Sequence, residues 1–322
     1  MIKEVLSVKN LSTYFFGRTG IVKAVDDVSF QLNNGEIMGL VGESGSGKTV
    51  TGFSLLGLVE EPGRIVKGSI KLNGTELINK NSSELRSLRG REISMIFQDP
   101  IATLNPVLTI GQQMHLAITA HEKMSSKAAE DRCSEMLSKI GIPSSRERLK
   151  AYPHEFSGGM RQRVAIAIAL LHHPSVIIAD EPTTALDVSI QAQILKEMRI
   201  MAAETGTALI WISHDLAVVS SLASKLCVMY AGQIVEYGPT SSILKNPHHP
   251  YTAGLIGSLP AMTKPGLPLK QIPGTTPSLL SLPLGCSFAP RCERKKSECD
   301  NNPKITHKKG RGCRCFNPIT KI

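Results

Sequence analysis

The octapeptide GESGSGKT, at residues 42–49, decides the fold of this 322-residue chain. It directly follows the apolar stretch Ile37–Val41 and opens a helical pattern over residues 48–58. A strand, a glycine-rich loop and a helix in this order are the context that identifies a P-loop, or Walker A motif. The motif predicts a nucleotide phosphate site made of Gly42, Glu43, Ser44, Gly45, Ser46, Gly47, Lys48 and Thr49.

The chemistry of residues 42–49, hereafter the phosphate loop, follows from its residue types. Its glycines let backbone N–H groups curl around phosphate oxygens, where side chains would obstruct. The helix N-terminus adds partial positive charge. The Lys48 ammonium can bridge the β- and γ-phosphates, and the Thr49 hydroxyl can bind Mg²⁺. We therefore expect a nucleoside triphosphate with Mg²⁺ in this loop.

Two acidic residues follow a second apolar strand, residues 176–179. Asp180 is suited to hold hydrated Mg²⁺, and Glu181 can polarise the attacking water as a general base. An Asp-Glu pair alone is typical of a helix cap. Together with the phosphate loop, it predicts ATP hydrolysis.

Buried strands alternate with helices along most of the chain, which requires a mostly parallel sheet covered on both faces. Residues 5–32, before the phosphate loop, are β-rich instead, and residues 111–140 read as a helical insertion. The longest apolar run, Val164–Leu171, has eight residues, well short of the ~20 that a spanning helix needs. No signal peptide is expected at the start. The predicted core strands are residues 37–41, 176–179 and 208–213, and the predicted helices between and beside them in the sequence are 48–58, 157–172 and 190–204.

Positive charge is concentrated at the C-terminal end. The chain has a net charge of +10, and residues 261–322 alone hold 12 Lys and Arg against three Asp and Glu. Such a tail can meet anionic lipid, nucleic acid or an acidic partner, or it can simply be solvated. The residue pattern leaves these alternatives open.

The cysteines are also unevenly placed. Cys133 and Cys227 stand alone and are predicted to be small buried side chains. The other five lie within thirty residues near the C-terminus, at 286, 292, 299, 313 and 315. Without an export signal, metal binding explains such a cluster better than disulfides do. Thiolates can hold Zn²⁺ or an iron–sulfur cluster, although the spacing is not the CxxC pair typical of structural zinc.

Four short segments accompany the phosphate loop in a fixed order. They are IFQDP (residues 96–100), FSGGMRQR (156–163), TTALD (183–187) and ISHD (212–215). Together they resemble the Q-loop, signature motif, D-loop and switch-histidine segment of ATP-binding cassette (ABC) ATPases. The resemblance covers about residues 3–245. It implies an α/β fold of the P-loop NTPase (ABC ATPase) class, with an N-terminal antiparallel β subdomain, a helical signature subdomain and a small Cys-rich C-terminal extension.

The resemblance also implies roles for single residues. Gln98 becomes the Q-loop glutamine, a further Mg²⁺ ligand near the permease contact, and His214 contacts the γ-phosphate and helps to position the water. Ser157 and Gly159, at a helix N-terminus, bind the γ-phosphate of a nucleotide held by a second ATPase. With Glu181, Gln98 and His214 form the expected catalytic set.

An aromatic residue is expected to stack on adenine. Phe16, just before Gly17, best matches that position, and Tyr14 is the alternative. Either ring could instead belong to the core.

Three other segments narrow the resemblance. They are DPIATLNP (99–106), NPHHPYT (246–252) and GCSFAPRC (285–292), and they are similar to the oligopeptide/dipeptide/nickel importer branch, of the dipeptide-importer ATPase type. This implies a peripheral protein on the cytoplasmic face of the bacterial inner membrane. The expected partners are a second ATPase subunit, two permease subunits and, indirectly, a solute-binding protein. On the same resemblance, a [4Fe–4S] cluster is expected on Cys286, Cys292, Cys299 and Cys315, with Zn²⁺ as the alternative.

The domain boundaries follow from these segments. Residues 1–258 are expected to form the ABC ATPase domain, with its helical subdomain at about 99–172. Six prolines between residues 260 and 283 predict an extended linker at 259–284. Residues 285–322 form what we call the Cys-rich module.

The predicted function is ATP hydrolysis that energises import of short peptides, or of a related solute such as nickel or a metal chelate. The alternative is an ABC ATPase that acts on nucleic acid or the ribosome. Aromatic residues make up only 4% of the chain, which leaves little material for base stacking. We therefore expect no nucleic-acid partner.

Overall fold

A computed structural model describes residues 3–184, 186–260, 266, 268 and 271–320. The described residues divide into two compact units. The first contains residues 33–36 and 80–210 with Lys3, and the second contains the remaining described residues.

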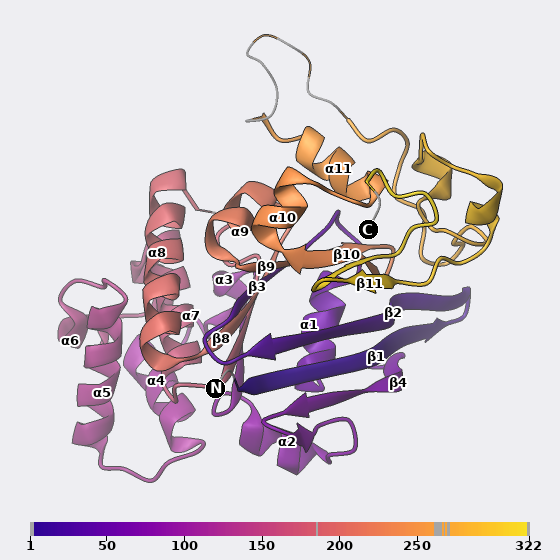
Figure 1. The fold of residues 1–322 in the computed structure, drawn as a ribbon. Helices are drawn as coiled ribbons and strands as arrows, with labels where there is room; N and C mark the ends of the chain where they lie inside the picture. Colours follow the sequence, from indigo (N-terminus) through magenta and orange to yellow (C-terminus); the bar gives the residue numbers. More distant parts are fainter. Residues whose placement is uncertain (1–2, 185, 261–265, 267, 269–270, 321–322) are drawn as a thin grey trace. The chain divides into compact units, whose positions relative to one another are not determined.

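The second unit begins with an antiparallel sheet in the strand order β2-β1-β4-β5 (Figure 1). In β1 and β4 the partners Leu6 and Leu72 are both buried. Asn73 and Gly74, both with positive φ, connect β4 to β5 by the two-residue turn expected of an Asn-Gly pair. The predicted N-terminal antiparallel β subdomain is confirmed. The strands are β1 (Glu4–Gly17), β2 (Gly20–Asn33), β4 (Gly63–Leu72) and β5 (Thr75–Glu76).

A second set of strands in this unit carries the phosphate loop. β3 (Ile37–Val41) is buried throughout and runs parallel to β9 (Lys225–Tyr230). A Cβ on Gly39 would lie 2.0 Å from Val219, so α9 (Leu216–Leu222) packs directly on β3. The other helices of this unit are α1 (Lys48–Leu56), α10 (Thr240–Lys245) and α11 (Pro250–Gly257).

β9 is followed by a tight hairpin, but the sheet continues beyond it. β10 (Gln233–Pro239) pairs antiparallel with β9 and, on its other side, with β12 (Arg311–Cys313). β11 (Thr306–Lys308) then pairs with β12. Two short strands of the Cys-rich module therefore extend the sheet, which the residue pattern did not predict. The module also has two 3-10 turns, η3 (Ala289–Arg291) and η4 (Ser297–Asp300).

The first unit contains a parallel strand pair and most of the helices. β6 (Ile93–Ile96) pairs with β7 (Val176–Asp180), and Ile96 lies beside Ala179 at their carboxyl ends. β8 (Ala208–Ser213), of which residues 208–210 belong to this unit and 211–213 to the second, is buried along its length. The helices are α2 (Ser82–Leu88), α3 (Pro100–Thr103), α4 (Ile110–Thr119), α5 (Ser126–Lys139), α6 (Ser145–Arg148), α7 (Gly158–Leu170) and α8 (Val188–Thr205), with a 3-10 turn η1 (Pro153–Glu155).

The predicted helical insertion at 111–140 contains two helices, α4 and α5. α4 ends at Thr119, and the Ser125 hydroxyl accepts a hydrogen bond from the Ala128 N–H to start α5. A serine cap of this kind begins a new helix by satisfying one of its first N–H groups. None of the helices formed by the described residues has the length and apolar character needed to cross a bilayer.

Candidate functional site

The phosphate loop lies between β3 and α1, where it was predicted. A Cβ on Gly42 would lie 2.3 Å from the Met229 carbonyl oxygen, and one on Gly47 would lie 2.1 Å from that of Ala24. Glycine is therefore required at both positions by close backbone approach. At Gly45 an added Cβ would meet nothing within 4 Å. α1 starts after Gly47 with no side-chain cap, so no side chain of the loop occupies the first N–H groups of the helix, which can bind phosphate.

Lys48 is buried and lies over the loop that precedes it. Its ammonium donates to the carbonyl oxygens of Gly42 (2.8 Å) and Glu43 (2.9 Å). The Ser46 hydroxyl is 3.4 Å from the same nitrogen. Thr49, at the start of α1, is exposed. The ammonium thus lies at the phosphate loop and can exchange these carbonyl contacts for phosphate oxygens.

Glu43 has partners that the motif does not predict. Its backbone N–H donates to the Tyr251 hydroxyl at 2.9 Å, and its carboxylate pairs with Arg291 at 2.7 Å. Burial of the Glu43 carboxyl raises its pKa, but the hydrogen bonds from Arg291 and Thr276 have the larger combined effect. The pKa of Glu43 is therefore lower than its usual value. Neither Tyr251 nor Arg291 was predicted as a site residue. The sequence indicated them only indirectly, because the NPHHPYT and GCSFAPRC segments that contain them carry the resemblance to the peptide importer branch.

The carboxylates after β7 lie in the first unit with the Q-loop glutamine. Asp180 ends the strand and is 3% exposed, whereas Glu181 follows with φ 46° in the left-handed region. The Gln98 amide donates to the Glu181 carboxylate at 3.3 Å, and the Thr184 hydroxyl donates to it at 3.1 Å. Two of the three predicted catalytic residues are therefore in direct contact.

The signature segment begins α7 as predicted. Ser157 is its N-cap, and its hydroxyl accepts a hydrogen bond from the Met160 N–H at 3.3 Å. Ser157 is exposed. Gly159 is buried against α8, and a Cβ there would lie 3.1 Å from the Ile190 side chain. The helix start therefore presents polar groups outward, while Gly159 permits the close packing behind them. Ala185 of the neighbouring TTALD segment lies outside the described residues.

His214 and the aromatic candidates belong to the second unit. His214 is exposed at the end of β8, and Asp215 caps α9 through the Ala217 N–H at 2.8 Å. Phe16 is half-buried, with the Arg64 guanidinium 4.3 Å from the centre of its ring. The Tyr14 hydroxyl donates to Asp26 at 2.6 Å, and burial together with this carboxylate raises the pKa of Tyr14 to about 12. Phe16 as the residue that stacks on adenine, with Tyr14 as the alternative, therefore stays a prediction.

The cysteine predictions have two outcomes. Cys133 and Cys227 are buried as predicted. The Cys315 thiol interacts electrostatically with those of Cys286, Cys292 and Cys299, and burial raises its pKa to about 11. However, among the described residues no three His, Cys, Asp or Glu side chains are arranged to hold a metal ion. The predicted thiols thus share one neighbourhood but form no preassembled metal site.

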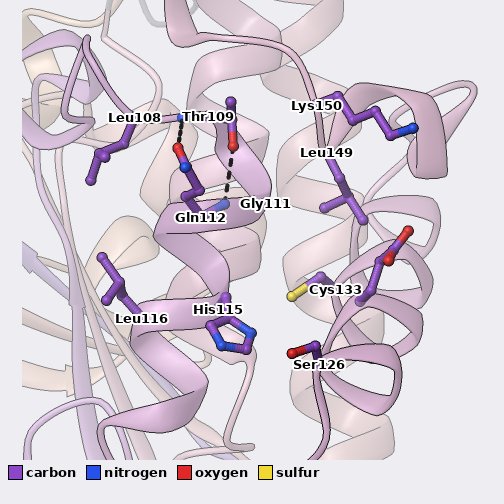
Figure 2. A pocket seen from close by; sticks show the side chains of 11 residues that line it. Leu108, Thr109, Gly111, Gln112, His115, Leu116, Ser126, Cys133, Leu149 and Lys150 are labelled. Carbon is purple, nitrogen blue, oxygen red and sulfur yellow. Dashed lines mark hydrogen bonds between the residues drawn. The ribbon is translucent and has the colours of Figure 1, made fainter.

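A groove of about 660 Å³ lies in the helical segment of the first unit (Figure 2). Its lining includes Leu116 on α4 and Cys133 on α5. Leu116 is 58% exposed, and Val107, next to the lining residue Leu108, is 75% exposed. We call this feature the α4–α5 groove. Exposed apolar side chains around a groove indicate a surface that receives another chain.

Two family models match this chain. The model described as "ABC transporter" matches residues 25–184, and the one described as "Oligopeptide/dipeptide transporter, C-terminal region" matches residues 235–299.

Similar proteins extend over nearly the whole chain. It is 46% identical to the oligopeptide transport ATP-binding protein OppD of Salmonella typhimurium, over 98% of this chain and 95% of that protein. It is 49% identical to the dipeptide transport ATP-binding protein DppD of Bacillus subtilis, over 93% of this chain and 90% of that one. Among solved structures, a dimeric ATP-binding cassette in a post-hydrolysis state with ADP and phosphate is similar with a TM-score of 0.66 and 25% identity, over 73% of this chain and 98% of that one.

Proposed function

The chain belongs to the ABC transporter family, in the branch of the oligopeptide and dipeptide transport ATP-binding proteins, and we propose that it hydrolyses ATP to drive import of short peptides. The observation that carries this proposal is the intact phosphate loop in a chain that is 46–49% identical to peptide-transport ATPases over nearly its full length.

The residues divide the chemical work as follows. Backbone N–H groups of the phosphate loop and Lys48 bind the β- and γ-phosphates. Hydroxyl, amide and carboxylate oxygens are ligands that suit Mg²⁺, and here Thr49, Gln98 and Asp180 would hold it. When bound there, Mg²⁺ would neutralise charge on the phosphates. The Glu181 carboxylate then accepts a proton from the attacking water while His214 orients the γ-phosphate.

We propose that the chain works with a second ATPase. A helix N-terminus binds anions through its first N–H groups and its partial positive charge. Ser157 is exposed at such a helix start in this chain, which supports a role in binding the γ-phosphate of the partner's nucleotide. ATP then joins the two ATPases, and its hydrolysis separates them.

We also propose a docking place for the permeases. The α4–α5 groove has exposed apolar side chains and lies in the helical segment that follows Gln98. A short amphipathic helix of a permease suits a groove of this kind. On this proposal, movement of the ATPases is passed to the permeases through the groove, and the chain works at the cytoplasmic face of the inner membrane.

A metal centre in the Cys-rich module is a further part of the proposal. Cys286, Cys292, Cys299 and Cys315 would hold a [4Fe–4S] cluster, with Zn²⁺ as the alternative, once their sulfurs close around it. Their electrostatic proximity supports this. Anaerobic purification followed by iron, sulfide and zinc analysis tests it: zinc without sulfide selects the alternative, and absence of both rejects a metal centre.

The function itself is tested in proteoliposomes that contain the chain with its second ATPase and permeases. We expect the peptide-loaded binding protein to stimulate ATP hydrolysis and peptide uptake. If only a nickel-loaded binding protein stimulates hydrolysis, the transported solute is nickel and the proposal of peptide import is wrong. Stimulation by nucleic acid, with no response to any loaded binding protein, would show that the chain is not a transporter subunit.

A further inference from the structure

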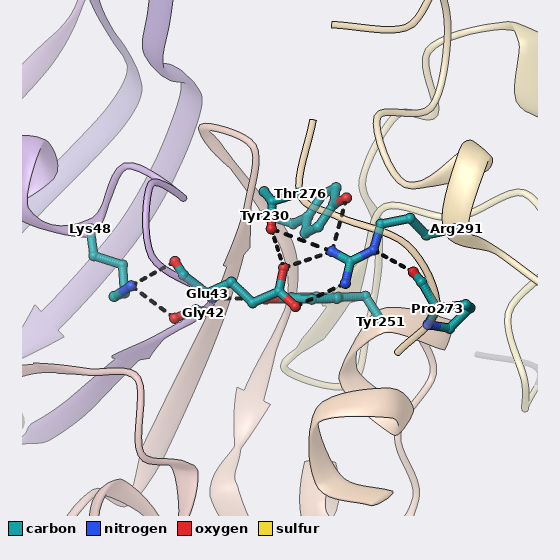
Figure 3. A network of polar contacts seen from close by, with 8 residues as sticks. All are labelled: Gly42, Glu43, Lys48, Tyr230, Tyr251, Pro273, Thr276 and Arg291. Carbon is teal, nitrogen blue, oxygen red and sulfur yellow. Dashed lines mark hydrogen bonds and ion pairs between the residues drawn. The ribbon is translucent and has the colours of Figure 1, made fainter. Parts of the chain in front are cut away.

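The Cys-rich module holds a residue of the phosphate loop directly. Arg291 and Glu43, which are 248 positions apart, form a two-pronged ion pair (Figure 3). One guanidinium nitrogen is 2.7 Å from Glu43 Oε2, and the other is 3.1 Å from Oε1. The Thr276 hydroxyl adds a third hydrogen bond to this carboxylate at 2.6 Å. Paired contacts of this type fix both the distance and the plane of a carboxylate.

The main chain of Glu43 is held as well. Its N–H donates to the Tyr251 hydroxyl at 2.9 Å. Its carbonyl oxygen accepts hydrogen bonds from the Lys48 ammonium at 2.9 Å and from the Ser46 N–H at 3.2 Å. A shift of Glu43 therefore moves the atoms that shape the loop and orient Lys48. The Cys-rich module can therefore influence the loop atoms and Lys48 through its contacts with the Glu43 side chain.

Contacts other than Glu43 also hold Arg291 in position. It is 8% exposed, and its Nε donates to the Pro273 carbonyl oxygen at 2.8 Å. Phe288, three residues earlier, is buried with its ring 5.3 Å from that of Tyr230 and 5.5 Å from that of Tyr251. This aromatic cluster anchors the module beside the loop. The Arg291–Glu43 ion pair is largely shielded from water. Removing one partner would leave the other charge buried without compensation, which destabilises the folded protein.

We propose that Arg291 is a positioning residue for ATP: docking of the Cys-rich module holds Glu43, and through it the phosphate loop, in the conformation that binds nucleotide. This inference rests on the proposed function only in that the loop binds ATP. It gives the module a role in the ATPase cycle. Because coupling between sites is reciprocal, nucleotide in the loop must also strengthen docking of the module.

The first test compares variants of the full-length chain in their affinity for a fluorescent ATP analogue with Mg²⁺. Arg291→Gln removes the charge and the paired contacts, and we expect it to raise the Kd about tenfold, within the range typical of coupled sites. Arg291→Lys keeps the charge but not the two-pronged geometry, so we expect an intermediate Kd. In the assembled transporter the Arg291→Gln change should raise the KM for ATP more than it lowers kcat.

The matched control is Arg314→Gln. Arg314 is also a buried arginine of the module, and it pairs with Asp27 at 3.0 Å and donates to the carbonyl oxygens of Ile234 and Pro303, all outside the phosphate loop. We expect this variant to lower the melting temperature while leaving the Kd near that of the wild type. Equal losses of affinity in Arg291→Gln and Arg314→Gln would overturn the proposal, because general loosening of the module would then explain both.

A double variant and hydrogen exchange complete the test. Glu43→Gln combined with Arg291→Gln should bind no more weakly than the weaker single variant, because the two residues act as one unit. Additive losses contradict this. ADP should slow amide exchange around residues 286–292 in the wild type but not in Arg291→Gln. Unchanged exchange in the wild type, with ADP bound, would also overturn the proposal. A wild-type chain that binds no nucleotide would instead refute the proposed function.

Discussion

The amide of Gln98 donates a hydrogen bond to the carboxylate of Glu181, with 3.3 Å between Nε2 and Oε2. The contact follows from strand pairing, because β6 and β7 are parallel neighbours whose carboxyl ends coincide at Ile96 and Ala179. Gln98 lies two positions after Ile96, and Glu181 lies two positions after Ala179. Their side chains therefore lie close together. The expected base is thereby joined to the segment that we propose leads to the permease.

The first prediction concerns Glu181. Glu181→Gln should reduce ATP hydrolysis by at least about a hundredfold, because the amide cannot accept the proton of the attacking water. Its side-chain oxygen can still accept from Gln98, so we expect nucleotide binding to persist and ATP-bound pairs of ATPases to accumulate. Phosphate release and size-exclusion chromatography with ATP measure both effects. Glu204→Gln, on the exposed end of α8, is the control, and undiminished phosphate release by Glu181→Gln would show that another group is the base.

The second prediction concerns Lys48. Lys48→Ala should abolish measurable ATP binding and transport, because the buried ammonium is the charged side chain over the loop carbonyls of Gly42 and Glu43. Equilibrium binding of labelled ATP and peptide uptake in proteoliposomes test this. Lys71→Ala, at an exposed position on β4, should behave as wild type. Normal transport by Lys48→Ala would contradict the nucleotide site itself.

The third prediction concerns the α4–α5 groove. Leu116→Asp puts a charge at a 58% exposed apolar position, and we expect it to weaken capture of the permeases and abolish peptide uptake. ATP binding by the isolated chain should be unchanged, because Leu116 lies outside the phosphate loop. Ile200→Asp is a matched control, because Ile200 is also apolar and 45% exposed but does not line the groove. Equal uptake by the two variants would contradict docking at this groove.

The fourth prediction concerns pH and His249. Burial lowers the pKa of His249 from 6.5 to about 3, and its Nδ1 accepts a hydrogen bond from the Tyr251 N–H at 3.0 Å. The native ring thus stays neutral while the unfolded chain takes up a proton below pH 6.5. The free energy of unfolding should therefore be complete above pH 6.5 and fall by about 1.4 kcal/mol per pH unit as the pH drops toward 4.

His249→Asn isolates this effect. The asparagine oxygen can still cap α11 by accepting from Tyr251, but the side chain does not titrate. We expect lower stability at pH 7.5 and a flatter acid dependence, measured by urea unfolding between pH 4.5 and 7.5. Wild type and variant with parallel profiles would show that His249 does not contribute to acid sensitivity.

The sequence by itself determined the parts of the protein that are encoded in consecutive residues. Residues 37–58 predict a strand, a phosphate loop and a helix, and each follows from local rules of apolar burial, glycine conformation and helix polarity. The core strands β7 and β8 were predicted for the same reason. Because parallel strands align their carboxyl ends, the contact between Gln98 and Glu181 was also within reach of sequence reasoning.

Only the tertiary structure decided which distant side chains meet. No periodicity links Arg291 to Glu43, and nothing in residues 306–313 indicates that β11 and β12 extend the main sheet. The fully buried Glu236 carboxylate, which accepts from the N–H groups of both histidines in NPHHPYT and pairs with Arg311, is a further example. Such contacts form because the folded chain must pair each charge that it removes from water, and the partner is selected by position in space rather than by separation along the sequence.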